Sequence, residues 1–140
     1  MNFAFEVAKD LRGGEVLALQ GDLGAGKTTF TKGLAEALKV NETITSPTFV
    51  ILKSYDAILP STHLQGVLEK VKLVHIDAYR CDSIEDIKSV GIEDYLGRDD
   101  VIMVVEWPEK IQELLPEDTI NIVFKSVDEK TREINYDFND

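Results

Sequence analysis

The sequence predicts a three-layer α/β domain with a mixed sheet, whose centre is parallel and whose edge is a C-terminal antiparallel hairpin. This prediction rests on three observations. An apolar strand pattern near the N-terminus runs directly into a glycine-rich loop and a helix. Strand and helix patterns then alternate, which favours parallel strands joined by helices. The last two strand patterns follow one another with only a short polar connection, as expected for a hairpin.

The first part of the chain begins with a helix and continues into a strand. Residues 3–11 place apolar side chains close to helical spacing, and Gly13 and Gly14 follow as a stop signal. EVLALQ, residues 15–20, predicts a buried strand. Residues 27–39 have an apolar stripe at helical spacing and predict the helix that follows the glycine-rich loop.

Two further strands are predicted on either side of a longer insert. Residues 49–55 and 72–77 are rich in branched and apolar side chains, which favour strands. Residues 56–71 predict a short amphipathic helix between them. Its apolar stripe would consist of Leu64, Val67, Leu68 and Val71.

Helices and strands continue to alternate after the insert. Ser83 with Asp86 three residues on resembles a capping box and predicts a helix start. VIMVV, residues 101–105, has no polar member, which is typical of a central strand covered on both faces. PEKIQELL predicts a helix with Pro108 at its first position.

The C-terminal segments TINIVFK and REINYDF alternate between apolar and polar residues. Joined by SVDEK, they predict an antiparallel hairpin with one solvated face. The apolar residues on the other face would be Ile120, Ile122, Phe124, Ile134, Tyr136 and Phe138.

Length and composition favour one soluble domain over residues 1–140, with 44% hydrophobic and 29% charged residues. The N-terminus lacks the apolar core of a signal peptide, and no run approaches the roughly 18 apolar residues that span a bilayer. We therefore expect a cytoplasmic protein without membrane contact. The single cysteine, Cys81, is interpreted as a structural residue, because it has no second thiol for a disulfide or a metal site.

The charge is unevenly distributed along the chain. The formal net charge is −11, and residues 1–81 carry equal numbers of acidic and basic side chains, so the whole excess lies in residues 82–140. A surface of this sign repels a phosphate backbone. We therefore expect either a solvated acidic face or a docking surface for a basic partner, and not non-specific nucleic-acid binding through this region.

GDLGAGKT, residues 21–28, matches the phosphate-loop pattern G-x-x-x-x-G-K-[ST] at every specified position. Glycines allow backbone N–H groups to converge on a phosphate, and the N-terminus of the following helix adds partial positive charge. The motif lies between a predicted strand and a predicted helix, which indicates a P-loop NTPase-like fold. The predicted nucleotide-binding residues are Gly21, Asp22, Leu23, Gly24, Ala25, Gly26, Lys27, Thr28 and Thr29.

Within the predicted site, Lys27 would reach the β- and γ-phosphates, and the Thr28 hydroxyl would ligate Mg²⁺. Phosphoryl transfer also requires an acid at the end of a neighbouring strand. Asp77 and Glu106 each follow an apolar strand, and either could hold Mg²⁺, directly or through water, or orient the attacking water. His75 is interpreted as a core histidine rather than a ligand.

The aromatic residue that follows the second acid, Trp107, has two interpretations. Core packing is the more common role of such a tryptophan, and a wall of the site is the alternative.

Five segments, GDLGAGKTTFTKGL, TSPTFVI, HIDAYR, GIEDYL and VEWPEK, resemble the TsaE (YjeE) family in order and approximate spacing. The resemblance runs from about Phe3 to about Phe124. It implies an Mg²⁺-dependent P-loop ATPase with slow intrinsic hydrolysis, in support of the complex that places threonylcarbamoyl on adenosine 37 of tRNA. It implies TsaB-like and TsaD-like protein partners, with only indirect contact to tRNA.

The resemblance also assigns roles by position. Lys27 and Thr28 correspond to the phosphate and magnesium residues, and Asp77 to the metal-coordinating aspartate. Thr48 of SPTF occupies the place of a switch-like threonine near the γ-phosphate, and Glu106 that of a second functional acid. Residues 56–71 depart from the family pattern, because they are longer than the turn expected there.

Three alternative functions share the phosphate loop. A small-molecule or nucleoside kinase usually carries several arginines on a lid, and the four arginines here are not clustered. A GTPase would carry an N-K-x-D motif, which this chain lacks. A structural subunit with a vestigial nucleotide site remains open. An arginine finger could come from Arg80 or from a partner.

Overall fold

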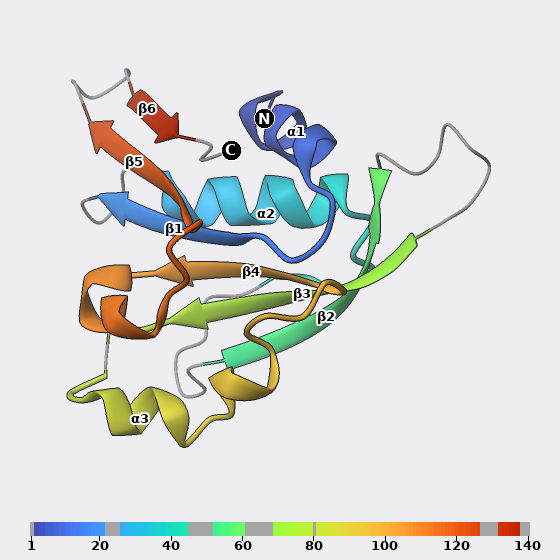
Figure 1. Ribbon diagram of the computed structural model, residues 1–140. Helices are drawn as coiled ribbons and strands as arrows, with labels where there is room; N and C mark the ends of the chain where they lie inside the picture. Colours follow the sequence, from blue (N-terminus) through green and yellow to red (C-terminus); the bar gives the residue numbers. More distant parts are fainter. Residues whose placement is uncertain are drawn as a thin grey trace.

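The computed structural model of the 140-residue chain describes residues 2–21, 26–44, 52–60, 69–79, 81–126 and 132–137. Its centre is one six-stranded sheet with strand order β2-β3-β4-β1-β5-β6 (Figure 1). The strands are β1 (Val16–Gly21), β2 (Leu52–Leu59), β3 (Glu69–Asp77), β4 (Val101–Glu106), β5 (Ile120–Ser126) and β6 (Arg132–Asp137). The helices are α1 (Asn2–Asp10), α2 (Lys27–Ala37) and α3 (Ile84–Lys88), with 3₁₀ turns η2 (Ile92–Asp94), η3 (Pro108–Lys110) and η4 (Gln112–Leu114).

The sheet is parallel at its centre and antiparallel at both edges. Strands β3, β4, β1 and β5 run in the same direction, whereas β2 is antiparallel to β3 and β6 is antiparallel to β5. The predicted mixed sheet with a C-terminal hairpin is therefore confirmed. Because the central strands are parallel, their carboxyl ends lie side by side along one border of the sheet, which is the edge that carries the candidate site below.

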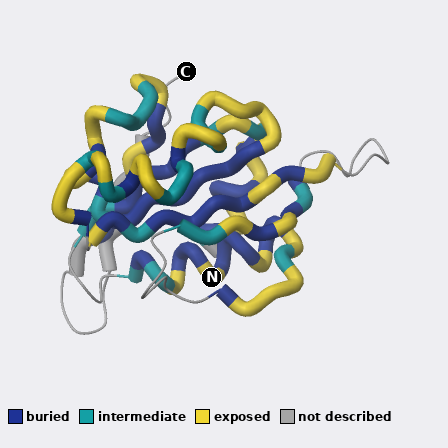
Figure 2. Tube along the Cα trace, turned by 90° about the horizontal axis from the view of Figure 1, so that it is seen from below, coloured by how far each residue is buried: buried dark blue, intermediate teal, exposed yellow. Residues whose placement is uncertain are grey.

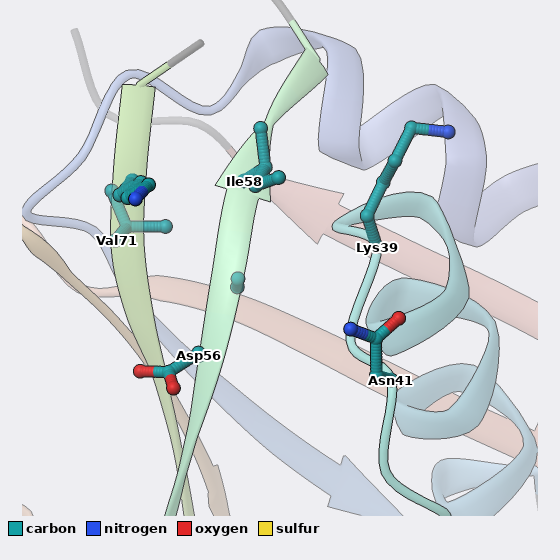
Figure 3. A pocket seen from close by; sticks show the side chains of 7 residues that line it. Lys39, Asn41, Asp56, Ile58 and Val71 are labelled. Atoms are coloured by element: carbon teal, nitrogen blue, oxygen red, sulfur yellow. The ribbon is translucent and has the colours of Figure 1, made fainter.

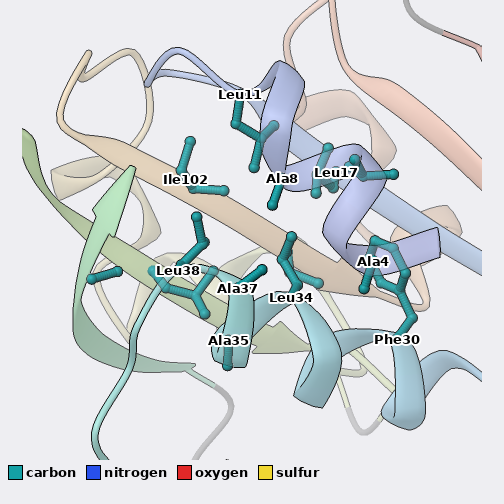
Figure 4. Close-up of a cluster of buried hydrophobic side chains, with 14 of the residues drawn as sticks. Ala4, Ala8, Leu11, Leu17, Phe30, Leu34, Ala35, Ala37, Leu38 and Ile102 are labelled. Carbon is teal, nitrogen blue, oxygen red and sulfur yellow. The ribbon is translucent and has the colours of Figure 1, made fainter. Parts of the chain in front are cut away.

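One face of the sheet is covered by the two N-terminal helices. Helix α1 packs against α2, and their apolar side chains meet those of the central strands (Figure 4). The phenyl ring of Phe30 on α2 lies 5.6 Å from that of Phe3 and 5.7 Å from that of Phe124, measured between centroids. The last of these rings belongs to β5, so this cluster joins both helices to the sheet.

The opposite face is covered by α3 and the 3₁₀ turns. Its buried cluster includes Val74 and Ile76 from β3, Met103 and Val105 from β4, and Ile87 from α3. Apolar clusters thus lie on both faces, and the central strands are buried along most of their length (Figure 2). The predicted three-layer arrangement is confirmed. Within the described ranges, no helix has the length and apolar character needed to cross a bilayer.

The insert at residues 56–71 differs from the predicted amphipathic helix. Residues 56–59 continue β2, and residues 69–71 begin β3, so Val71 lies in a strand rather than on a helix. The two strands pair over eight residues, from Leu52 with Ile76 to Leu59 with Glu69. Cross-strand pairing, which includes the apolar pair Ala57–Val71 and the ion pair Asp56–Lys72, here prevails over helical spacing. The other three residues of the predicted stripe lie outside the described ranges.

The segment after β4 also differs from the prediction, because it forms two 3₁₀ turns and not one α-helix. Pro108 occupies the first turn of η3, as predicted. The helical path is interrupted at Ile111, whose φ of −132° and ψ of 22° are not helical. This side chain is fully buried in the cluster beneath the sheet. Ile111 was expected to lie on the apolar side of one continuous helix. It is buried instead at the break between the two 3₁₀ turns.

Two other predictions are confirmed with local changes. Helix α3 follows Ser83, but no side-chain cap hydrogen bond forms from this residue, and the carboxylate of Asp86 instead accepts a bond from the N–H of Asp82 at 2.9 Å. In the hairpin, Ile120, Ile122 and Phe124 are buried as predicted. Phe138, predicted on the same face, lies outside the described residues.

Helix α2 ends with a non-glycine residue in the left-handed conformation. Lys39 has φ of 59°, and the N–H of Val40 bonds to the carbonyl of Ala35 at 3.0 Å, while that of Lys39 bonds to Glu36 at 3.1 Å. This pair of bonds is a Schellman motif, which usually has glycine at the left-handed position. The lysine therefore carries backbone strain.

We expect Lys39→Gly to raise the free energy of unfolding by about 1 kcal/mol, because glycine relieves the left-handed strain. Lys32→Gly, at an exposed interior position of the same helix, should lower it by about 1 kcal/mol. Urea denaturation of both variants measures these changes. A loss of stability in Lys39→Gly would contradict the assignment of strain.

Candidate nucleotide-binding site

The predicted site lies at the edge of the sheet where three parallel strands end. Gly21 ends β1, Glu106 ends β4 and Asp77 ends β3. In the strand register, Glu106 is opposite both Leu19 and Asp77. Helix α2 begins at Lys27 beside the same edge. The predicted site residues Asp22, Leu23, Gly24, Ala25 and Thr48, and the candidate finger Arg80, lie outside the described residues.

The two described glycines of the phosphate-loop motif meet different constraints. Gly21 has φ of 141°, and a Cβ there would overlap the carbonyl oxygen of Phe124 on the neighbouring strand. Gly26 has φ of 107°, and a Cβ there would meet only a ring carbon of Phe124 at 3.7 Å. The first glycine is therefore required by strand packing, whereas the second is required mainly by its backbone conformation.

The start of α2 presents backbone donors without a side-chain cap. Gly26 is the N-cap residue in a left-handed conformation, and no side chain among the described residues caps the helix there. The first N–H groups of an α-helix have no partner within the helix, and the helix dipole favours an anion beside them. This end of α2 therefore suits a phosphate group.

Lys27 is held inside the site and does not extend into solvent. The residue is only 5% exposed, and its Nζ donates a hydrogen bond of 2.8 Å to the carbonyl of Gly21. The same atom lies 4.0 Å from the ring centroid of Trp107. A carbonyl dipole and an aromatic face both favour a buried ammonium group. These two contacts stabilise the cation at the mouth of the predicted phosphate loop.

Trp107 combines its two predicted roles, because it packs against the cluster beneath the sheet and its ring also faces Lys27 in the candidate site. It follows β4 directly and adopts the left-handed conformation with φ of 60°. Its ring also contacts the exposed ring of Tyr79 at a centroid distance of 4.9 Å. Lys110 lies beyond, with Nζ 5.8 Å from the Tyr79 ring. This aromatic wall links the ends of β3 and β4.

The cysteine next to this wall is consistent with its predicted structural role. Cys81 is buried, and burial, followed in importance by the charge of Asp86, raises the pKa of its thiol. The thiolate is the reactive form of cysteine. A thiol with a raised pKa is therefore a poor nucleophile near neutral pH.

Asp77 is half-buried at the end of β3. One carboxylate oxygen, Oδ1, accepts a hydrogen bond of 3.0 Å from the N–H of Tyr79. The N–H of Ala78 bonds to the carbonyl of Glu106 at 3.0 Å, so the backbone after β3 is fixed to the end of β4. The strand and these two bonds therefore orient Asp77 at the edge of the sheet.

Glu106 is almost fully buried and contacts a histidine that the sequence interpretation treated as part of the core. Glu106 is 5% exposed and His75 is fully buried. The distance between His75 Nε2 and Glu106 Oε2 is 2.7 Å. The sequence spacing could have indicated this contact, because alternate residues of a strand point to the same face of the sheet. His75 lies two residues before Asp77, whose register partner is Glu106.

The described part of the chain fits Mg²⁺ only in combination with phosphate. No group of three or more His, Cys, Asp or Glu side chains in these ranges could hold a metal ion by itself. Mg²⁺ usually binds through one or two carboxylates, waters and substrate phosphates. The Thr28 hydroxyl at the start of α2 and the carboxylates of Asp77 and Glu106 are oxygen ligands of this kind. The donor set thus suits Mg²⁺ bound together with a nucleotide.

Two cavities lie away from these residues. One, of about 320 Å³, lies between the end of α2 and strands β2 and β3 (Figure 3). At its border, Lys72 bonds to Asp56 at 2.6 Å, and this contact lowers the pKa of the carboxyl. The other, of about 230 Å³, lies beside η4 and the start of β5. Neither contains Lys27, Asp77 or Glu106 in its lining.

Residues 1–134 match a family model described as threonylcarbamoyl adenosine biosynthesis protein TsaE. A protein named tRNA threonylcarbamoyladenosine biosynthesis protein TsaE from Bacillus subtilis is 41% identical over 124 residues, which cover 88% of this chain and 69% of the relative. A protein of the same name from Treponema pallidum is 38% identical over 128 residues, covering 91% and 85% of the two chains.

A solved structure has a similar fold over nearly the whole chain. It is the crystal structure of YdiB from Bacillus subtilis, which superposes with a TM-score of 0.69 at 36% sequence identity. The match covers 96% of this chain and 75% of the other. The predicted fold class thus agrees with an experimental structure.

We expect Gly21→Ala to lower the free energy of unfolding by about 3 kcal/mol, because it adds a steric overlap to an unfavourable backbone conformation. Gly26→Ala, which meets no such overlap, should cost about 1 kcal/mol. Chemical denaturation without nucleotide compares the two variants. Equal losses would contradict the different constraints assigned to these glycines.

Proposed function

Because the chain belongs to the TsaE family, we propose that it binds Mg-ATP at this site and hydrolyses it slowly. This hydrolysis would support the proteins that make N6-threonylcarbamoyladenosine at position 37 of tRNA. The observation that carries the proposal is the position of Lys27. A buried ammonium group lies at the start of an uncapped helix, next to the strand ends that present two acids.

The residues would divide the work according to their positions. The backbone N–H groups at the start of α2 and the Lys27 ammonium would hold the phosphates, with Lys27 exchanging its bond to Gly21 for phosphate oxygens. Thr28 and Asp77 would hold Mg²⁺, which would neutralise negative charge on the phosphates. Thr48 would act near the γ-phosphate, as the family resemblance implies.

Glu106 suits a different role from Asp77. Its carboxylate is nearly fully buried and bonded to His75, whereas Asp77 is half-buried at the end of the neighbouring strand. Asp77 is therefore the acid proposed to ligate Mg²⁺. Glu106 is proposed to orient the attacking water, with ligation of Mg²⁺ through water as its secondary role.

Hydrolysis by the chain alone should be weak, because the described site holds few positive charges. Lys27 lies at the strand ends, Lys110 lies farther out beside Tyr79, and Arg98 is bonded to Asp100 at 2.8 Å. Transferring phosphoryl groups usually require an arginine or an equivalent charge. We propose that TsaB-like and TsaD-like protein partners complete the site or use the energy of its ATP hydrolysis. The chain would contact tRNA only indirectly, and it would act with these partners in the cytoplasm.

Calorimetric titration with ATP and GTP, each with and without Mg²⁺, tests the nucleotide site. We expect Lys27→Ala to weaken ATP binding by about 100-fold, because hydrogen bonds to a charged group are lost. Lys32→Ala on the exposed face of the same helix should leave binding unchanged. Asp77→Ala should mainly remove the Mg²⁺ dependence. Unchanged affinity in both site variants would refute the assignment.

The second test concerns partner dependence. We expect slow ATP hydrolysis by the isolated chain and an increase of about 10-fold or more with purified TsaB and TsaD proteins, because the described part of the site holds few positive charges to stabilise the transition state. Steady-state phosphate release measures both rates. Turnover by the isolated chain at the rate of a dedicated hydrolase would contradict this mechanism.

A further inference from the structure

We infer that His75 is a positioning residue for ATP hydrolysis, which acts by fixing the carboxylate of Glu106 through its Nε2–H group. The inference rests on the proposed function, because it assigns a role within that same site. It starts from a contact between two buried polar side chains, with 2.7 Å between His75 Nε2 and Glu106 Oε2.

The contact is set by rigid elements. His75 is paired with Val104 in the parallel register, and Glu106 follows two residues later on the same strand. Since alternate residues share a face, both polar side chains lie on the sheet face that α2 covers. Neighbouring strands in the centre of a sheet hold their relative positions, so the distance between these side chains does not depend on a flexible loop.

Burial makes this hydrogen bond necessary for the carboxylate. The side chains of His75 and Glu106 are only 1% and 7% exposed. A carboxylate withdrawn from water is unfavourable unless donors replace its hydration. A bond of this length is typical of a charge-assisted interaction. His75 therefore supplies a donor to the acid proposed to orient water.

The carboxylate partner of Nε2 and the surroundings of the other ring nitrogen both favour one tautomer of His75. His75 Nδ1 is buried and has no hydrogen-bond partner among the described residues. A proton on Nδ1 would leave a buried donor unsatisfied, which is costly. The proton therefore belongs on Nε2, and the imidazole donates to Glu106 and does not accept from it. One carboxylate oxygen is then engaged, and Oε1 is the oxygen left to meet water.

The role differs from simple core packing. Neighbours of His75 on the same face of β3, Val71 and Leu73, are apolar and fully or nearly fully buried. An apolar residue would fill the same layer without an unsatisfied nitrogen. The polar contact made by the histidine goes to Glu106, so its effect on the reaction passes through that residue.

The test uses His75→Leu and His75→Gln, assayed with purified TsaB and TsaD proteins. His75→Leu removes the donor, and kcat for ATP hydrolysis should fall by about 10- to 100-fold, with the dissociation constant for Mg-ATP little changed. The amide of His75→Gln places a donor near Nε2 and should restore most of kcat. Leu73→Met, a buried apolar change on the same strand face, serves as the packing control.

A double-mutant cycle separates positioning from general destabilisation. If His75 acts through Glu106, the double variant His75→Leu with Glu106→Gln should have the same kcat as Glu106→Gln alone. Multiplicative losses, or a kcat for His75→Leu equal to the wild-type value, would overturn the inference. If thermal unfolding shows that His75→Leu is not folded, the test uses the other variants. In that case, a kcat of His75→Gln equal to that of the wild type, together with a loss of kcat in Glu106→Gln, supports the inference. If both histidine variants are folded and lose kcat equally, the inference is overturned.

The proposed function is tested separately by the wild-type chain. Wild-type protein that neither binds nor hydrolyses ATP would refute the proposed function and the inference with it. Wild-type hydrolysis that His75→Leu leaves intact would refute only the role of His75.

Discussion

The parallel register of β1, β4 and β3 is the constraint on which the candidate site depends. Residues far apart in sequence, Gly21, Asp77 and Glu106, meet because the strands that carry them end at one edge. Apolar clusters on both faces hold these strands in place. The positions of the functional groups therefore follow from the hydrophobic packing of the sheet, since side chains at strand ends inherit the rigidity of the strands.

Two buried charges at this edge are stabilised in different ways. Lys27 and Glu106 are each only 5% exposed. The ammonium has a backbone carbonyl and an aromatic face, while the carboxylate has the histidine. Each charged group thus has a partner of its own. A direct salt bridge between them would neutralise the site before any nucleotide arrived.

The sequence predicted the fold well where pattern and packing agree, and less well where they compete. Strands β1 and β4 are apolar on both faces, so their central positions were predictable from composition alone. The strand extension containing Val71 was not, because its residues also fit helical spacing and only pairing with β2 decides between the two. Ile111 likewise fits a helix in sequence, but its burial accompanies a break between two 3₁₀ turns.

The sequence predicted which charged residues belong to the candidate site, but not which side chains each of them contacts. Asp77 and Glu106 were identifiable because each follows an apolar strand. The contacts of His75 and Trp107 depend on neighbouring strands and on the position of α2, which a single-sequence pattern does not give. Aromatic and histidine residues are also frequent in ordinary cores, so their types alone do not indicate a site.

The position of Lys27 bears on how strongly the site can bind nucleotide. In this structure its ammonium already has two favourable contacts, with the Gly21 carbonyl and with the Trp107 ring. A bound phosphate would have to replace at least the hydrogen bond between Lys27 Nζ and the Gly21 carbonyl. Only the difference in free energy between that bond and the new bond to phosphate would contribute to affinity. The same exchange frees the Gly21 carbonyl and changes the environment of Trp107. That ring also contacts the exposed Tyr79, so binding of phosphate at the proposed site would change the surroundings of an aromatic side chain on the outside of the molecule.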